Sequence, residues 1–67
     1  MFETVIEILE DSGYKILNYE GTLNSLEILF DEPVYESDIE FALNESNYSG
    51  DIISYGNRVR ITNMEKI

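Results

Sequence analysis

Almost every side chain that could do chemistry in this chain is a carboxylate. The sequence has 14 acidic residues and no histidine or cysteine, so it lacks the usual general base and the commonest metal ligand. The acidic pairs Asp31/Glu32 and Asp38/Glu40 could in principle bind Ca²⁺ or Mg²⁺, but they lack the ligand spacing of an EF-hand loop. No Gly-rich phosphate-binding loop is present. We therefore expect a protein that is not an enzyme and that uses no metal and no cofactor.

The excess of negative charge indicates the kind of partner. Fourteen acidic residues stand against 4 basic ones, which gives a formal net charge of −10. A charge of this size repels nucleic acids and anionic membranes and attracts basic surfaces. The expected partner is therefore another protein, for example a basic nucleic-acid-binding protein. We expect neither a membrane nor direct binding to nucleic acid.

The composition predicts one small folded domain, residues 1–67. Hydrophobic residues make up 43% of the chain, including five Tyr and three Phe, which is too rich for a disordered acidic tail. No apolar run approaches the ~20 residues of a membrane span, and no signal peptide is visible. These features favour a cytoplasmic protein, in the host cell if the protein is viral. A domain this small buries only about 60% of its unfolded surface, so a partner or a second copy would add stability.

Two helices are predicted to position the carboxylates. Residues 1–11 carry an apolar stripe at helical spacing, formed by Phe2, Val5, Ile6 and Leu9. Gly13 then provides a natural helix stop. The second helix is expected from Ser37 to residue 46 or 47. Its start matches a capping box, in which Ser37 and Glu40 each satisfy a free backbone N–H.

Strands are predicted at residues 14–19 and 25–30, joined by a short loop, and within residues 51–62. The last stretch contains Gly56-Asn57 between two runs of β-forming residues, which is typical of a hairpin with a two-residue turn. Pro33 cannot continue a central strand, so it separates the first hairpin from the second helix.

The order helix, strand, strand thus occurs twice, at about 1–31 and about 36–64. Matching short motifs support an internal repeat, because Ser12-Gly13 resembles Ser49-Gly50 at the same spacing. The predicted fold is therefore α+β, a two-layer sandwich in α-β-β-α-β-β order. Its four-stranded antiparallel sheet would carry both helices on one face.

The Gly56-Asn57 turn also predicts which strand residues face the helices, because residues directly opposite each other share a face. The expected core-facing set is Ile52, Ser54, Val59 and Ile61, joined through the repeat by Ile16, Asn18, Leu26, Ile28 and Phe30. The opposite face would be mixed, with apolar, aromatic and basic side chains. Its expected partner-binding residues are Leu17, Tyr19, Leu29, Ile53, Tyr55, Arg58 and Arg60.

Two functions of different classes follow. The first is a small acidic inhibitor or nucleic-acid mimic whose carboxylates occupy the basic site of a DNA- or RNA-handling protein. In size and charge this profile resembles small phage-encoded proteins that block restriction, CRISPR or repair enzymes. The expected acidic helical face consists of Glu3, Glu7, Glu10, Asp11, Glu36, Asp38, Glu40 and Glu45, with Asp31 and Glu32 in the nearby loop.

The second function is a homodimeric structural or adaptor module that associates through the outer face of the sheet. A large apolar patch rimmed by charge is typical of an interface. The alternative without any function is that Tyr and Ile on this face simply fit a pleated surface, and that the acidic helices are only solubilising. The two functions can also coexist, because a dimer joined by its sheets would display acidic helices on both outer sides.

Overall fold

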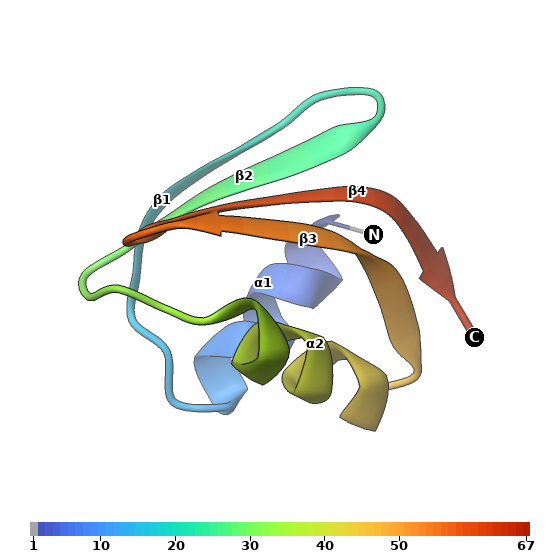
Figure 1. Cartoon of the computed structure of the whole chain (residues 1–67). Helices are drawn as coiled ribbons and strands as arrows, with labels where there is room; N and C mark the ends of the chain where they lie inside the picture. The colour runs from blue at the N-terminus through green and yellow to red at the C-terminus, as the bar shows by residue number, and fades with distance from the viewer. Residues whose placement is uncertain (1) are drawn as a thin grey trace.

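A computed structural model describes residues 2–67 of the chain. Two helices and four strands follow one another in the order α-β-β-α-β-β (Figure 1). Their bounds are α1 Phe2–Asp11, β1 Ile16–Gly21, β2 Ser25–Phe30, α2 Glu36–Glu45, β3 Tyr48–Tyr55 and β4 Arg58–Lys66. The sheet is antiparallel throughout, with strand order β1-β2-β4-β3. No helix within residues 2–67 is long and apolar enough to cross a membrane.

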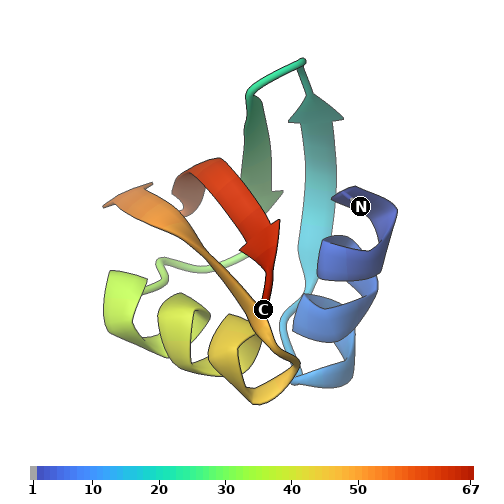
Figure 2. The same cartoon turned by 90° about the vertical axis from the view of Figure 1, so that its right-hand side faces the viewer.

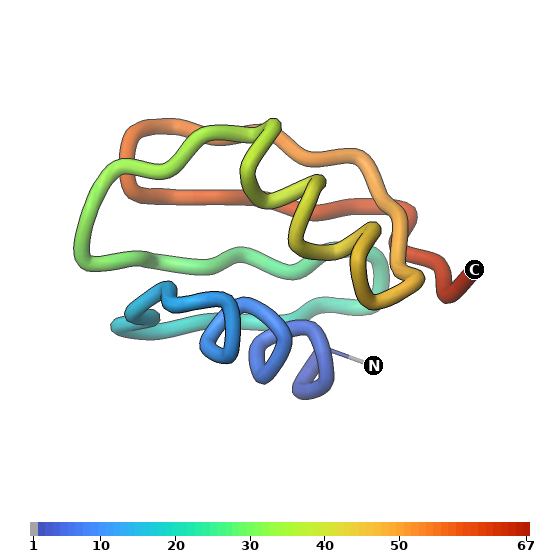
Figure 3. The backbone as a smooth tube through the Cα atoms, turned by 90° about the horizontal axis from the view of Figure 1, so that it is seen from below, coloured from blue at the N-terminus to red at the C-terminus, as the bar shows by residue number. Residues whose placement is uncertain are grey.

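The helices cover one face of the sheet, as seen from below in Figure 3. In Figure 2, α1 lies along β1, and α2 lies beneath β3. The predicted α+β class, element order and two-layer arrangement are confirmed. The two hairpins meet at the centre of the sheet, where β2 pairs with β4. This pairing leaves β1 and β3 as the edge strands.

The core lies between the helices and the sheet. The predicted helical stripe is confirmed at Val5, Ile6 and Leu9, which are buried. Together the buried side chains form one cluster: Val5, Ile6, Leu9, Leu26, Ile28, Phe30, Val34, Ile39, Ala42, Leu43, Tyr48, Val59 and Ile61. Full burial of one such aliphatic or aromatic side chain stabilises a fold by about 1.5–3 kcal/mol relative to exposure. The cluster is therefore the main source of stability that holds the outer surfaces in place.

The start and end of α2 differ from prediction. The helix begins at Glu36 after Tyr35 in an extended conformation, and no side chain caps it. Ser37 is therefore inside the first turn, and the predicted capping box is wrong. The helix is followed by Asn47 with φ 64°, a left-handed residue of the kind that often ends helices. Gly13, with φ 100°, has the expected role after α1.

The predicted internal repeat is not shown by the structure and stays a prediction. One of its matched motifs has different roles in the two halves, because Gly13 follows a helix whereas Gly50 lies within β3. A Cβ atom on Gly50 would lie 3.0 Å from Cγ2 of Ile61. The absence of a side chain at Gly50 thus permits a close approach between β3 and β4. At the same place the register of the two strands shifts, with Asn63 and Met64 on β4 opposite Gly50.

The second hairpin has the predicted register, with Tyr55 opposite Arg58 and Ile53 opposite Arg60. Gly56 has φ 62° whereas Asn57 does not have a positive φ, as in a type II′ turn, whose first central residue is usually Gly. The turn is bonded to the last residue of β2. The Asn57 side chain donates to the carbonyl oxygen of Phe30 at 3.1 Å, and the backbone N–H of Phe30 donates to the Asn57 carbonyl at 2.8 Å.

The first hairpin contains a β-bulge that the sequence prediction missed. The register between β1 and β2 shifts between Ile16 and Asn18. Beyond the bulge, Asn18 lies opposite Leu29 and Tyr19 lies opposite the buried Ile28. The side-chain alternation is therefore reversed. The predictions that Asn18 faces the helices and that Tyr19 lies on the outer face are both wrong.

Candidate functional site

The face of the sheet opposite the helices carries two rows of side chains across all four strands. The first row runs Asn18, Leu29, Arg58, Tyr55, and the second runs Glu20, Glu27, Arg60, Ile53. We refer to these eight residues as the outer sheet face. Each row takes one residue from β1, β2, β4 and β3 in that order, because directly opposed residues share a face.

The β3 side of the outer sheet face is apolar. Tyr55 is 68% exposed and Ile53 is 43% exposed, and Leu29 on β2 is half-buried. A strand face that serves only as a solvated surface alternates more completely to polar residues. Tyr55 and Leu29 line a shallow hollow of about 380 Å³ on the same face, together with Glu27, Arg58 and Arg60.

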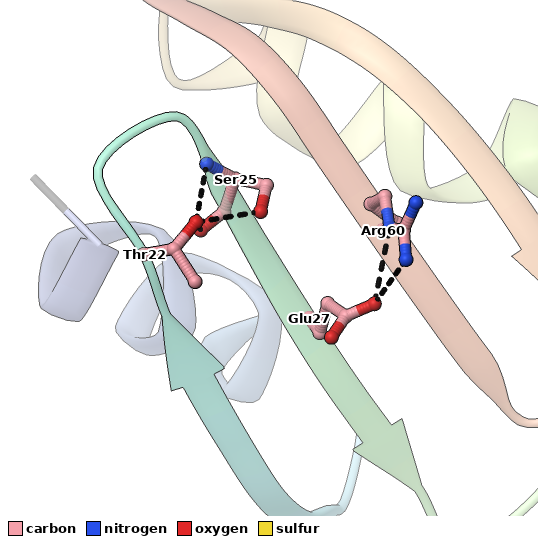
Figure 4. A network of polar contacts seen from close by, with 4 residues as sticks. All are labelled: Thr22, Ser25, Glu27 and Arg60. Atoms are coloured by element: carbon pink, nitrogen blue, oxygen red, sulfur yellow. Dashed lines mark hydrogen bonds and ion pairs between the residues drawn. The ribbon is translucent and has the colours of Figure 1, made fainter.

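The two central strands carry an ion pair in the middle of this face (Figure 4). Nη2 and Nε of Arg60 on β4 donate to Oε1 of Glu27 on β2, at 2.8 and 3.0 Å. The hydrogen bond from Arg60 to Glu27 and the charge of Glu27 raise the pKa of Arg60 above its usual value. Both side chains are about half exposed, so the pair remains accessible to a partner.

The acidic helical face is as exposed as predicted. Glu3, Glu7, Glu10 and Asp11 on α1 and Glu36, Asp38, Glu40 and Glu45 on α2 are all exposed. Within the described part of the chain, the pair of Glu27 and Arg60 is the one salt bridge. Glu36 differs from the others, because its carboxylate accepts a hydrogen bond from the backbone N–H of Ser54 on the edge strand β3 at 3.1 Å.

Tyr14 is partly buried against the core. The ring of Tyr14 packs edge-on against Phe30, with ring centres 5.5 Å apart and planes at 67°. Burial raises the pKa of Tyr14 above its usual value, and the negative charge of Asp38 adds to this effect. The contact with Phe30 and the partial burial are consistent with a packing role for Tyr14.

The predicted sheet-face residues are brought together in part. Leu29, Ile53, Tyr55, Arg58 and Arg60 form one continuous surface. Leu17 lies at the bulge and is 54% exposed, and Tyr19 lies on the opposite side of β1 from the outer sheet face.

Sequence reasoning missed Asn18 and Glu20, which take the outer positions on β1. The one sequence feature that could have placed them is the turn between β1 and β2. Thr22 N–H donates to the Ser25 carbonyl, so Leu23-Asn24 is the two-residue turn that sets the register from that end. Leu23 at this turn is 94% exposed beside a second hollow, lined by Phe2, Asn24, Ile61, Asn63 and Met64.

The arrangement suits binding through surfaces. No group of three or more metal-ligating side chains occurs among residues 2–67. Comparison with protein-family models, with curated proteins and with solved structures found no match for this chain. The two surfaces suited to binding are the acidic helical face and the outer sheet face.

Proposed function

We propose that this protein is a small acidic protein-binding module that occupies the basic site of a DNA- or RNA-handling protein, as an inhibitor or nucleic-acid mimic. The observation that carries the proposal is that eight carboxylates on the two helices are all exposed and that none of them is in a salt bridge within residues 2–67. Unpaired charge on rigid helices is available to a basic partner at little cost in ordering.

The arrangement of these carboxylates in a row supports the proposal. Glu3, Glu7 and Glu10 follow one another at intervals of four and three residues, so they share one side of α1. At a rise of 1.5 Å per residue they are spread over about 10 Å of helix. A DNA strand also presents its phosphates in a row, although more closely spaced, with one per about 3.4 Å of its axis. A second row on α2 adds width to this negative surface, and the net charge of −10 would accelerate encounter with a positive groove.

The test begins with capture of partners by the immobilised protein from its own cell, or from the host cell if it is viral. A purified partner is then assayed for nucleic-acid binding with and without this protein. We expect competition with nucleic acid, and an affinity for the partner that falls about tenfold or more between roughly 50 and 200 mM salt. An affinity that is flat across this range would refute the proposal.

A matched pair of double variants distinguishes the effect of charge on the helices from the effect of total net charge on partner affinity. Glu7→Lys with Glu40→Lys reverses two charges on the helices, whereas Glu20→Lys with Glu65→Lys reverses two charges elsewhere. Each pair changes the formal net charge from −10 to −6, since each reversal adds two. We expect the helix variant to lose partner affinity by about tenfold more than the other, because like charges placed opposite a basic site are repelled. Equal losses would mean that only total charge matters.

A homodimeric structural or adaptor module is the second candidate function. It is supported by a specific observation, the exposed Tyr55 and Ile53 on the outer sheet face. An exposed apolar patch beside charged groups is typical of a protein interface. If Ile53→Ala together with Tyr55→Ala leaves association in solution unchanged, this candidate is excluded.

A further inference from the structure

We propose that the outer sheet face binds a second copy of this chain, related to the first by a two-fold axis parallel to the strands and midway between β2 and β4. This inference rests on the second proposed function, the homodimeric module, and defines its geometry. The observation behind it is the distribution of charge on the outer sheet face.

The two rows that define the outer sheet face are together electrically neutral. They contain two carboxylates, Glu20 and Glu27, and two guanidinium groups, Arg58 and Arg60. Asp51 lies in the next row of the same side of the sheet, opposite Thr62, and accepts a hydrogen bond from the Asn63 side chain at 2.8 Å. The remaining 12 acidic and 2 basic residues therefore carry the entire net charge of −10. Two copies that approach through any strongly acidic surface repel each other, whereas this face imposes no net repulsion.

The charges are also divided between the two halves of the face. Both carboxylates lie on β1 and β2, and both guanidinium groups lie on β4. A two-fold axis between β2 and β4 places β2 of each copy against the partner's β4. Glu27 then meets the partner's Arg60, and Arg60 meets the partner's Glu27. Because each copy already joins Glu27 to Arg60, the four side chains would form a ring of alternating charge around the axis.

The other simple orientation is unfavourable. A two-fold axis perpendicular to the strands, midway between the two rows, would place Arg58 against the partner's Arg60. Like charges directly opposed across an interface are costly. The charge pattern therefore selects one orientation, which also sets Leu29 against the aliphatic stem of the partner's Arg58.

A standard interface would take up a modest part of this small molecule's surface. Each partner in a standard protein interface contributes about 800 Å², which is less than a fifth of the 4489 Å² accessible surface of residues 2–67. Tyr55, Ile53 and Leu29 supply apolar area beside the charged centre, and aromatic residues with Arg are the side chains that most often dominate interface energies.

The test uses a charge exchange within one chain, Glu27→Arg together with Arg60→Glu. This variant retains an ion pair between β2 and β4, so its fold can be checked against the wild type by circular dichroism. We expect the wild type to dimerise between about 1 μM and 1 mM in analytical ultracentrifugation. The exchanged variant should dimerise with itself to a similar degree. In a mixture, the wild type and the variant should avoid each other, because Glu then faces Glu and Arg faces Arg.

The mixture is analysed by native mass spectrometry, with one chain isotope-labelled. Free exchange would yield about half of the dimers as mixed species in a symmetric pair, and we expect a share about tenfold smaller. A wild type that stays monomeric to about 1 mM overturns both the homodimeric function and this geometry. A wild-type dimer that mixes freely with the variant, or a variant that cannot dimerise with itself, overturns the geometry alone.

A second variant keeps the proposal testable if the charge exchange prevents folding. Glu27→Gln with Arg60→Gln removes both charges while retaining side chains of similar length. We expect dimerisation several-fold weaker than that of the wild type and almost independent of salt, since the central ion pairs are gone. Association that is unchanged in strength and in salt dependence would show that these charges do not lie at the interface.

Discussion

Asn57→Asp changes one hydrogen-bond donor into an acceptor of nearly the same shape at the turn between β3 and β4. Nδ2 of Asn57 lies 3.1 Å from the carbonyl oxygen of Phe30, at the end of a central strand. A carboxylate cannot donate to this oxygen and repels it instead. Loss of the bond costs about 1 kcal/mol and the unfavourable contact about as much again, so we expect the free energy of unfolding to fall by about 2 kcal/mol.

This loss is large for a chain of this size. A domain of 67 residues has a stability of about 3–10 kcal/mol, and 2 kcal/mol corresponds to a melting temperature lower by roughly 8–16 °C. The assay is urea unfolding followed by far-ultraviolet circular dichroism at neutral pH. The matched control is Asn24→Asp, which adds the same charge in the turn of the first hairpin, where Asn24 is exposed.

The effect should also depend on pH. A carboxylate at residue 57 facing a carbonyl would have a pKa raised in the folded state, since only its protonated form can donate. The variant should therefore recover stability relative to the control as pH falls below about 4, and lose it as pH rises through the raised pKa. If Asn57→Asp and Asn24→Asp differ by less than about 0.5 kcal/mol at neutral pH, the hydrogen bond to Phe30 does not stabilise the fold.

Two further predictions concern packing and pH. Gly21→Ala should lower the free energy of unfolding by about 1–2 kcal/mol, because the new Cβ would lie 2.8 Å from Cε2 of Phe2. Phe2→Leu added to this variant should recover part of the lost stability, as measured by urea unfolding. No recovery would argue against the contact. The raised pKa of Tyr14 means that its contribution is complete below about pH 10 and is lost as pH rises through the folded-state pKa. Tyr14→Phe should therefore lose less stability than the wild type between about pH 8 and pH 11, and equal losses in urea midpoint would contradict this assignment.

Much of the fold could be predicted because short-range signals agreed with one another. The Gly56-Asn57 turn predicted the register of the second hairpin, and the pairs Ile53 with Arg60 and Ile52 with Ile61 are confirmed. The helical stripe of α1 is buried as expected. In both cases a local pattern of two to eleven residues was sufficient, because turn geometry and side-chain period are properties of the chain itself.

The errors come from features that depend on distant parts of the chain. The bulge in β1 moves Asn18 to the outer face of the sheet and Tyr19 to the helix-facing side. No residue type in β1 indicates that a bulge is present. Residues 48–50 form the start of β3, whereas the sequence predicts strand only within residues 51–62. There the buried Tyr48 is held by tertiary packing, which outweighs local propensity.

The candidate site was predictable to a similar extent. The outer positions on β3 and β4 follow from one turn, whereas those on β1 require the bulge. The order of the strands was not readable from the sequence. It is nevertheless the order β1-β2-β4-β3 that places Glu27 next to Arg60 and so creates the charged centre of the outer sheet face.

The pairing of β2 with β4 at the centre of the sheet has a consequence for how the molecule could be divided. Each α-β-β half has an unpaired strand edge where β2 meets β4. The turn of the second half is also bonded to Phe30 at the end of β2 in the first half. A backbone cut between Glu32 and Pro33 would therefore produce two fragments with matching open edges. Such fragments are suited to reassemble with each other, so the chain could be divided into a compact two-piece reporter whose signal requires both pieces to meet.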